Sequence, residues 1–313
     1  MRLSHTVLTV GIVVATTLPL AGTASARETT VTGRITATDY STASPTLVTL
    51  DPASGSVTGT FAQGAEDGVL APKGAEVAYI HRDDTCLPQP EGCMYARDLV
   101  VAEADGTGQR VLVEGVQPET GEAPEVARPD WSPDGKRIVY DSPRGLEWIK
   151  ADGTGHEVLT STGLYGTFSP DGKSIAFLRS TRYETGDGWE YGTDVWVMDT
   201  ATRQVRQLTT GHDVSSTPVD WSPDGQRIVH ATDYGLRVLD VTTGTGTDLQ
   251  SGWPSPLSGV QAPVFSPDGT RIAFSATDEF TYTHGTYVVD AADGGNLQVL
   301  TDRPVRLTDW LDR

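Results

Sequence analysis

The chain has 313 residues, 37% of them hydrophobic, and a formal net charge of −19 at pH 7. A surface this acidic repels phosphate backbones and anionic lipid headgroups, so the composition argues against a nucleic-acid partner. The length fits one large domain or two of ordinary size and does not decide between them.

The N-terminus has the layout of a secretory signal peptide. Arg2 provides a positive charge, residues 7–20 form a mostly apolar run, and Ala24-Ser25-Ala26 is a small-residue cleavage site. The run is too short to span a bilayer, no later stretch is apolar enough, and no nearby cysteine offers a lipid anchor. We predict a signal peptide over residues 1–26 and a mature chain of residues 27–313. The mature protein is expected to be secreted, or held in the cell envelope by a partner.

The two cysteines, Cys86 and Cys93, lie close together in a loop that contains two prolines and a glycine. In an exported protein such a pair is typical of a local disulfide. A metal-binding or redox pair is the alternative, but it needs further ligands, and only His81 lies nearby in the sequence. We therefore predict a Cys86–Cys93 disulfide that staples one loop.

A ten-residue unit repeats along the chain, and each copy has the chemistry of a β-hairpin. An aromatic residue ends one strand, Pro fixes φ in the turn, Gly adopts the left-handed conformation, and an alternating Ile-x-aromatic strand follows. The clear copies, each continuing with Ser-Pro-Asp-Gly, begin at Trp131, Phe168, Trp221 and Phe265, and a degenerate copy begins at Leu70.

Each hairpin is followed by two further strand-like segments, which predicts four-stranded meanders. Six copies of these later segments occur, but only five complete hairpins. Residues 308–310 resemble the inner strand of a sixth hairpin, and residues 33–37 resemble its second strand. We predict an all-β fold, a six-bladed β-propeller of four-stranded blades that forms a single domain over residues 27–313. The C-terminal strand is expected to close the first blade.

The Trp/Phe-Ser-Pro-Asp-Gly-x-x-Ile-Ala-Phe unit resembles the WD-like repeat of the TolB propeller family, over about residues 31–313. The resemblance implies a six-bladed propeller that serves as a docking platform. TolB carries an α/β domain before its propeller, whereas here the repeats begin close to the predicted mature N-terminus. Other relatives are fused to a hydrolase domain, which we do not expect in this chain. The resemblance implies a fold and a mode of binding, but no named partner.

The sequence lacks the common catalytic motifs, including Gly-x-Ser-x-Gly, His-Glu-x-x-His, a phosphate-binding glycine loop and an EF-hand. We therefore predict no catalytic residue and no metal site. His230 takes a position that is aromatic in the other repeats, so we expect a buried core residue. His81, His212 and His284 lie in or beside long loops, and they hold a metal only if folding brings them together.

Loop length is asymmetric between the two faces of the predicted ring. Loops from the second to the third strand of a blade, and loops between blades, open on one face, and all the extra length falls there. We call it the long-loop face; the other, with its short Ser-Pro-Asp-Gly and Asp-x-x-Gly turns, is the short-turn face. The long loops are residues 81–94, 116–129, 180–193, 211–218, 251–261 and 277–285.

Long loops on a rigid scaffold are a common place for binding residues. Here they carry aromatic and histidine side chains that we predict to contact a partner. This set is Tyr183, Trp189, Tyr191, His212, Trp253, Phe280, Tyr282 and His284. The alternative is that the rings fold back onto the blades.

The residue before the inner-strand aromatic is an aspartate in alternate blades: Asp130, Asp220 and Asp309. In the derived blade order these carboxylates surround the axis with approximate threefold symmetry. They are expected either to hold a cation, for which calcium suits an exported protein with oxygen ligands, or to accept hydrogen bonds from nearby backbone amides. No other cofactor is expected.

Three functional hypotheses follow from these observations. The first is a secreted, monomeric, non-enzymatic binding propeller that docks a protein, a peptide or an envelope glycan on its long-loop face. The second is a polysaccharide lyase or hydrolase with its site at the mouth of the channel. The third is a purely structural subunit.

Overall fold

The computed structural model describes residues 33–82, 87–89, 92–94, 96–115, 126–185, 188–232, 235–250 and 253–312. The predicted signal peptide lies outside the described residues, and so do Cys86 and the side chain of Cys93. Their cleavage and pairing therefore stay predictions. Within the described ranges, no helix has the length and apolar character needed to cross a membrane.

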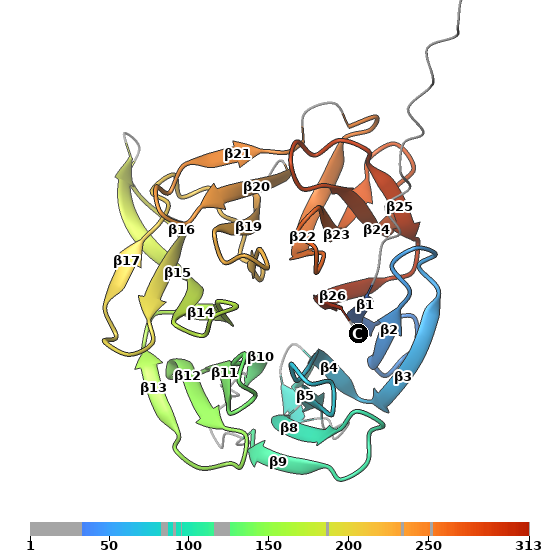
Figure 1. Cartoon of the computed structure of the whole chain (residues 1–313), viewed down its shortest axis with the longest axis vertical. Helices are drawn as coiled ribbons and strands as arrows, with labels where there is room; N and C mark the ends of the chain where they lie inside the picture. Colours follow the sequence, from blue (N-terminus) through green and yellow to red (C-terminus); the bar gives the residue numbers. More distant parts are fainter. Residues whose placement is uncertain are drawn as a thin grey trace, which may run out of the picture. The chain divides into compact units, whose positions relative to one another are not determined.

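Six four-stranded antiparallel sheets form the blades of a ring, each with its first strand beside the central axis (Figure 1). From the axis outward, blade 1 consists of β26 (Val305–Leu311), β1 (Arg34–Asp39), β2 (Thr46–Leu50) and β3 (Val57–Gln63). Blade 2 consists of β4 (Ala65–Leu70), β5 (Glu76–Arg82), β8 (Arg97–Glu103) and β9 (Arg110–Val113). Blade 3 consists of β10 (Ala127–Trp131), β11 (Arg137–Ser142), β12 (Gly145–Lys150) and β13 (Glu157–Thr160).

Blades 4 to 6 follow the same order. Blade 4 consists of β14 (Leu164–Phe168), β15 (Ser174–Thr185), β16 (Gly188–Asp199) and β17 (Val205–Gln207). Blade 5 consists of β18 (Asp220–Trp221), β19 (Arg227–Thr232), β20 (Gly235–Asp240) and β21 (Gly246–Asp248). Blade 6 consists of β22 (Leu257–Phe265), β23 (Arg271–Asp278), β24 (His284–Asp290) and β25 (Gln298–Thr301). A short hairpin of β6 (Leu87–Gln89) and β7 (Gly92–Met94) lies between β5 and β8. The predicted fold class is confirmed.

The repeated turn owes its shape to hydrogen bonds that its own side chains make. In the copy of blade 3, Ser132 Oγ donates to Asp134 Oδ1 over 2.7 Å, and the Lys136 amide donates to the same oxygen over 3.0 Å. Gly135 has φ of 69°, which only glycine adopts without cost. The same turn recurs in blades 4, 5 and 6, so four of the six blades share it on the short-turn face.

Aromatic side chains of the second strands fill the core between blades. Tyr79, Tyr140, Phe177 and Phe274 are almost completely buried. His230 takes the equivalent place in blade 5, where it is fully buried with Nδ1 3.0 Å from the Ala231 carbonyl oxygen, as expected for a core residue. Burial lowers its pKa, so the ring is held neutral.

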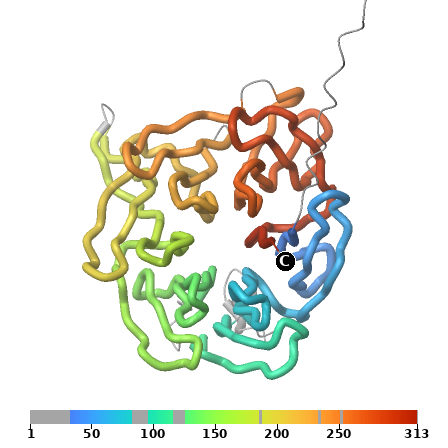
Figure 2. The backbone as a smooth tube through the Cα atoms, in the orientation of Figure 1, coloured from blue at the N-terminus to red at the C-terminus, as the bar shows by residue number. Residues whose placement is uncertain are grey.

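The C-terminal strand closes the ring. β26 pairs antiparallel with β1, with Ile35 opposite Trp310, and Figure 2 shows the two ends of the propeller side by side. Two ion pairs reinforce the closure: Arg303 to Asp39 at 2.6 Å, and Arg306 to Asp67 of the neighbouring blade. The sequence prediction of a first blade completed by the last strand is confirmed.

Candidate binding face and central channel

The exposed aromatic side chains of the described residues all lie where a second strand of a blade passes to the third. These residues are Tyr40, Trp189, Tyr191, Phe280 and Tyr282. The last four belong to the predicted binding set and are between 57% and 85% exposed. These four rings come from β16 of blade 4 and from the passage between β23 and β24 of blade 6.

Other members of the predicted set are used within the fold. Trp253 stacks on Phe274 with ring centroids 5.4 Å apart and donates from Nε1 to the Gly294 carbonyl oxygen over 3.0 Å. Tyr183 stacks on His212 at 4.2 Å. For these three residues the structure favours the alternative in which rings fold back onto the blades.

The three loop histidines lie on different blades. His81 is on β5 of blade 2, His212 lies between β17 and β18, and His284 begins β24 of blade 6, where its Nδ1 is 3.4 Å from Thr277 Oγ1. In the described part of the chain, no three His, Cys, Asp or Glu side chains are grouped so that they could hold a metal ion.

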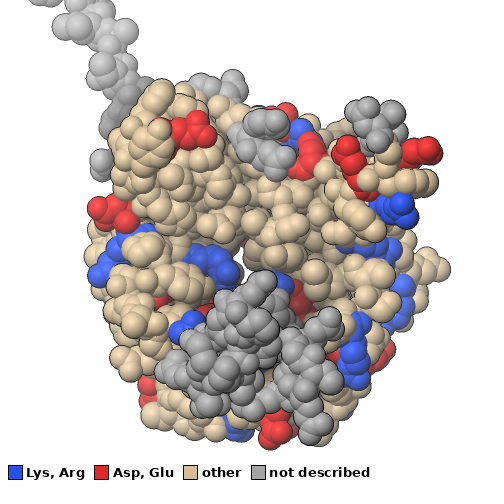
Figure 3. Space-filling view, turned by 180° about the vertical axis from the view of Figure 1, so that it is seen from behind, with Lys and Arg blue, Asp and Glu red and all other residues tan. Residues whose placement is uncertain are grey.

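A cavity of about 130 Å³ lies in the channel between the inner strands. Its long-loop end is lined by Arg128, Tyr165 and Arg306, and basic side chains border the central hollow in Figure 3. Arg128 Nε lies 2.6 Å from Asp141 Oδ2, and its guanidinium group sits over the Tyr165 ring at 4.1 Å. The mouth therefore combines paired charges with an aromatic ring, which suits a polar ligand of low net charge.

The inner strands bulge at this level, a feature that the sequence analysis missed. Asp67, Arg128, Tyr165 and Ala262 have φ between 49° and 59°, and the register of each strand shifts at or beside them. Left-handed backbone is uncommon for residues other than glycine, and it re-aims side chains at bulges. The signal available was the Gly or Pro that follows each of these residues.

The three aspartates lie deeper in the channel, and two of them, Asp130 and Asp220, tie neighbouring blades together. Asp130 Oδ2 accepts from the Phe168 amide over 2.7 Å, and Asp220 Oδ2 accepts from the Phe265 amide over 2.7 Å. Asp309 Oδ1 accepts from the Trp310 amide of its own strand. These contacts match the second predicted role, acceptance from backbone amides.

Burial raises the pKa of each of these three carboxyls. The pKa of Asp130 rises to about 6. That of Asp309 rises to about 7, with the charge of Asp130 adding to the effect of burial. For Asp220, burial and then Asp309 raise the pKa well above the ordinary value of 3.8. The charges therefore repel one another across the channel and favour proton uptake near neutral pH.

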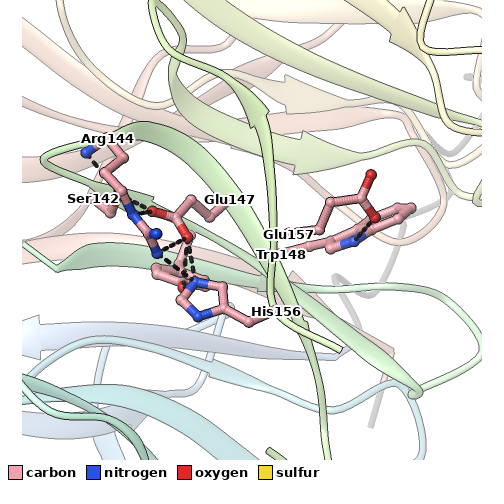
Figure 4. A network of polar contacts seen from close by, with 7 residues as sticks. Ser142, Arg144, Glu147, Trp148, His156 and Glu157 are labelled. Atoms are coloured by element: carbon pink, nitrogen blue, oxygen red, sulfur yellow. Dashed lines mark hydrogen bonds and ion pairs between the residues drawn. The ribbon is translucent and has the colours of Figure 1, made fainter. Parts of the chain in front are cut away.

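Another buried carboxylate, that of Glu147, lies in blade 3. Glu147 is fully buried, and Arg144 donates to it twice over 2.8 Å, while Ser142, His156 and Tyr140 also contact it (Figure 4). Burial alone would raise the pKa of Glu147, but the donors Ser142 and Arg144 and the charge of His156 lower it overall. Both carboxylate oxygens of Glu147 contact side chains of the same blade, so this group supports the blade.

Six four-stranded blades around a polar channel place the protein in the class of six-bladed β-propellers. Solved structures with a similar fold include two TolB proteins. A putative TolB from Agrobacterium tumefaciens superposes with a TM-score of 0.55 at 16% identity, covering 88% of this chain and 98% of that one. TolB from Acinetobacter baumannii superposes with a TM-score of 0.54 at 21% identity, covering 82% of this chain and 65% of that one.

An oligogalacturonate lyase in complex with manganese is also similar, with a TM-score of 0.51 at 15% identity, over 78% of this chain and 73% of that one. The Tol-Pal system protein TolB of Francisella tularensis subsp. holarctica is 27% identical over 211 residues, 63% of this chain and 45% of that protein. Dipeptidyl-peptidase 5 of Porphyromonas endodontalis is 24% identical over 272 residues, which are 68% of this chain and 37% of that protein. The chain thus spans less than half the length of these curated relatives. No family model matches it.

Proposed function

We propose that this protein is a secreted, non-enzymatic binding propeller that docks a protein, a peptide or an envelope glycan on its long-loop face. The observation that carries the proposal is the placement of the exposed aromatic rings, which among the described residues all lie at passages from a second to a third strand. Tyr and Trp rings provide large contact areas with a polar end, and they are enriched at the energetic centres of interfaces.

The rings of blade 6 are presented on a rigid turn. Asp278 Oδ1 accepts from the amides of Phe280 and Thr281 over 2.8 and 2.9 Å, and the Tyr282 amide donates to the Asp278 carbonyl oxygen over 2.8 Å. A turn fixed in this way loses little conformational entropy when a ligand binds. Such order supports a binding role for Phe280 and Tyr282, because the rings themselves contribute little to the fold.

The site of action that we propose is extracellular or in the cell envelope. It rests on the signal-peptide pattern of residues 1–26 and on the name of the Francisella relative, a Tol-Pal system protein. The net negative charge of the chain argues against a nucleic acid or an anionic membrane as the ligand, because like charges repel.

The test compares three purified proteins against a glycan array and a native secretome. One is the wild type, one carries Ala at Trp189, Tyr191, Phe280 and Tyr282, and a control carries Ala at the exposed short-turn residues Lys136 and Lys173. We expect the fourfold variant to lose at least about tenfold in affinity, since single anchors each contribute over about 1 kcal/mol. Loss of binding in the control alone would place the site on the short-turn face.

A polysaccharide lyase or hydrolase is the second candidate, because three carboxyls with raised pKa values line the channel. Carboxyls of this kind serve as general acids in glycoside cleavage. The protein is incubated with a panel of neutral and acidic polysaccharides, and new reducing ends and unsaturated products are measured. Turnover that Asp220→Asn abolishes, and that the fourfold aromatic variant retains, would favour this candidate over the binding module.

A further inference from the structure

Two strands of blade 4 continue beyond the blade as a two-stranded arm. β15 and β16 pair continuously from Ser174 opposite Asp199 to Thr185 opposite Gly188, whereas β14 pairs with β15 no further than Leu178. On the other side, β17 pairs with β16 only from Trp196 to Met198. Figure 1 shows the hairpin projecting past the neighbouring strands. Residues 180–193, expected as a loop, are therefore mostly strand.

An isolated two-stranded ribbon is marginally stable in water, so the arm needs support from elsewhere. His212, which precedes blade 5, provides it at the base of the arm. Its ring stacks on Tyr183 of β15 with centroids 4.2 Å apart and planes 11° apart. Its Nδ1 lies 2.7 Å from Asp194 Oδ2 of β16, and its amide donates to Asp194 Oδ1 over 3.2 Å.

Asp194 is itself held firmly. The side chain is fully buried and accepts from Thr209 Oγ1 over 2.9 Å and from Gln207 Nε2 over 3.2 Å. A buried carboxylate with this many donors is costly to move. His212 is thus fixed to the blade through Asp194 and to the arm through Tyr183.

The close approach of His212 to the arm has a structural cost. His212 has φ of 59°, a left-handed conformation that is uncommon for residues other than glycine. At Gly192 a Cβ atom would collide with the Cβ of His212, so only glycine fits there. The left-handed backbone of His212 and the requirement for glycine at position 192 are the local cost of this close contact, which the parallel bridge between Thr193 and Asp213 adjoins.

The arm presents its aromatic face away from this clamp. Trp189 and Tyr191 lie opposite Glu184 and Arg182, on the strand face opposite to that of Tyr183, and they are 57% and 74% exposed. The Arg182 guanidinium covers the Trp189 ring at 4.5 Å. Tyr183 thus contacts His212 on one face of the arm, and Trp189 and Tyr191 lie exposed on the other face.

We propose that His212 is a positioning residue for ligand binding: by clamping Tyr183 to Asp194, it fixes the β15–β16 arm so that Trp189 and Tyr191 face the ligand in one orientation. This inference rests on the proposed binding function of the long-loop face. Fixing exposed rings before binding removes the entropic cost of ordering them in the complex. His212 acts through the arm, and its own ring face and Nδ1 are occupied within the fold.

The experiment reads the arm directly and needs no ligand. Tryptophans are labelled with 5-fluorotryptophan, Trp189→Phe assigns the Trp189 resonance, and ¹⁹F NMR is combined with amide hydrogen exchange of residues 180–192. His212→Ala and Gly192→Ala are expected to shift or broaden the Trp189 resonance and to speed exchange in the arm by about tenfold or more. The resonances of the other tryptophans are expected to stay in place.

Two variants separate positioning from a general loss of fold. His212→Asn keeps a residue that tolerates left-handed backbone and an amide donor for Asp194, so it should restore part of the protection. Trp189→Ala removes an exposed ring and should leave exchange in the arm unchanged. An arm that exchanges in His212→Ala as it does in the wild type would overturn the proposal. A negative glycan and secretome screen with a normal wild-type arm would instead overturn the proposed binding function.

Discussion

At the scale of single residues, the channel aspartates combine structural and electrostatic roles. Asp130 and Asp220 accept hydrogen bonds from the next blade. Burial and mutual repulsion nevertheless disfavour the charged form of Asp220. The pKa of Asp309 rises to about 7 from 3.8, so the folded protein holds protons that the unfolded chain releases. Stability gained at acidic pH is therefore lost as the pH rises from about 4 to about 7.

Asp309→Asn should raise the free energy of unfolding at pH 8, because the amide oxygen still accepts from the Trp310 amide and the repulsive charge is gone. The gain is on the order of a few kcal/mol at pH 8 and should fall below about 1 kcal/mol near pH 4, where the folded wild type is protonated and the unfolded carboxyl is about half protonated. Urea denaturation at pH 4, 6 and 8 measures it.

Asp134→Asn is the matched control, because hydrogen bonds from Ser132 and Lys136 lower the pKa of Asp134 in its exposed turn. A lowered pKa gives stability above pH 4 that is lost in acid, so this variant should be less stable than wild type at pH 8. An Asp309→Asn variant that differs in stability from the wild type by the same amount at pH 4 and at pH 8 would contradict the expected effect of Asp309.

Trp253 and Tyr282 are a second pair for comparison, because Trp253 packs within the fold whereas Tyr282 is exposed. Trp253→Ala removes the stack on Phe274 and the bond to Gly294, and it should cost about 2–4 kcal/mol of stability. Tyr282→Ala removes a ring that is 85% exposed and should change stability by less than about 0.5 kcal/mol. Thermal and urea denaturation compare the two; equal losses would show that Tyr282 is part of the core.

At the scale of elements, the closing strand gives a sharp test. Deletion of residues 304–313 removes β26, leaves β1 as an unpaired edge, and breaks the Arg306–Asp67 pair between blades 1 and 2. We expect a lower unfolding midpoint, loss of cooperativity and a tendency to aggregate. Calorimetry and light scattering check this, and an unchanged cooperative transition would mean that the ring does not depend on β26.

The arm of blade 4 differs from its sequence prediction, because residues expected to form a loop are mostly strand. Residues 180–193 are long and polar, without the aromatic-turn unit, so the sequence indicated a loop. In the fold, pairing continues through Ser180 and Thr193 because the two strands leave the blade already in register. A register that is set in the blade continues along both strands into the arm, and the local sequence of the arm does not indicate this pairing.

At the scale of the whole molecule, the predicted disulfide is the remaining covalent question. Cys86 and Cys93 are the only cysteines. Intact mass of the exported protein without reductant should therefore be lower by two hydrogens than after reduction. Complete alkylation of both thiols in the unreduced protein would contradict the pairing. Because the loop is local, its reduction should alter global stability less than deletion of β26 does.

The sequence alone determined the architecture. The Ser-Pro-Asp-Gly turn encodes its own geometry through Ser132, Asp134 and Gly135, and its recurrence counts blades without any tertiary information. The same counting revealed the split first blade and its closing strand, because a missing hairpin must be completed from the chain ends. Local chemistry and periodicity were sufficient for both.

Only the tertiary structure decided which side chains are available to a ligand. Trp253 and Tyr282 are equivalent in sequence, aromatic residues in long polar loops, yet one stacks on Phe274 and the other is in solvent. The clamp of His212 on Tyr183 and Asp194, and the bulges that turn Arg128 and Tyr165 into the channel, likewise join residues from separate blades or strands. Burial and charge pairing depend on distances between segments remote along the chain, and a single sequence carries no measure of those distances.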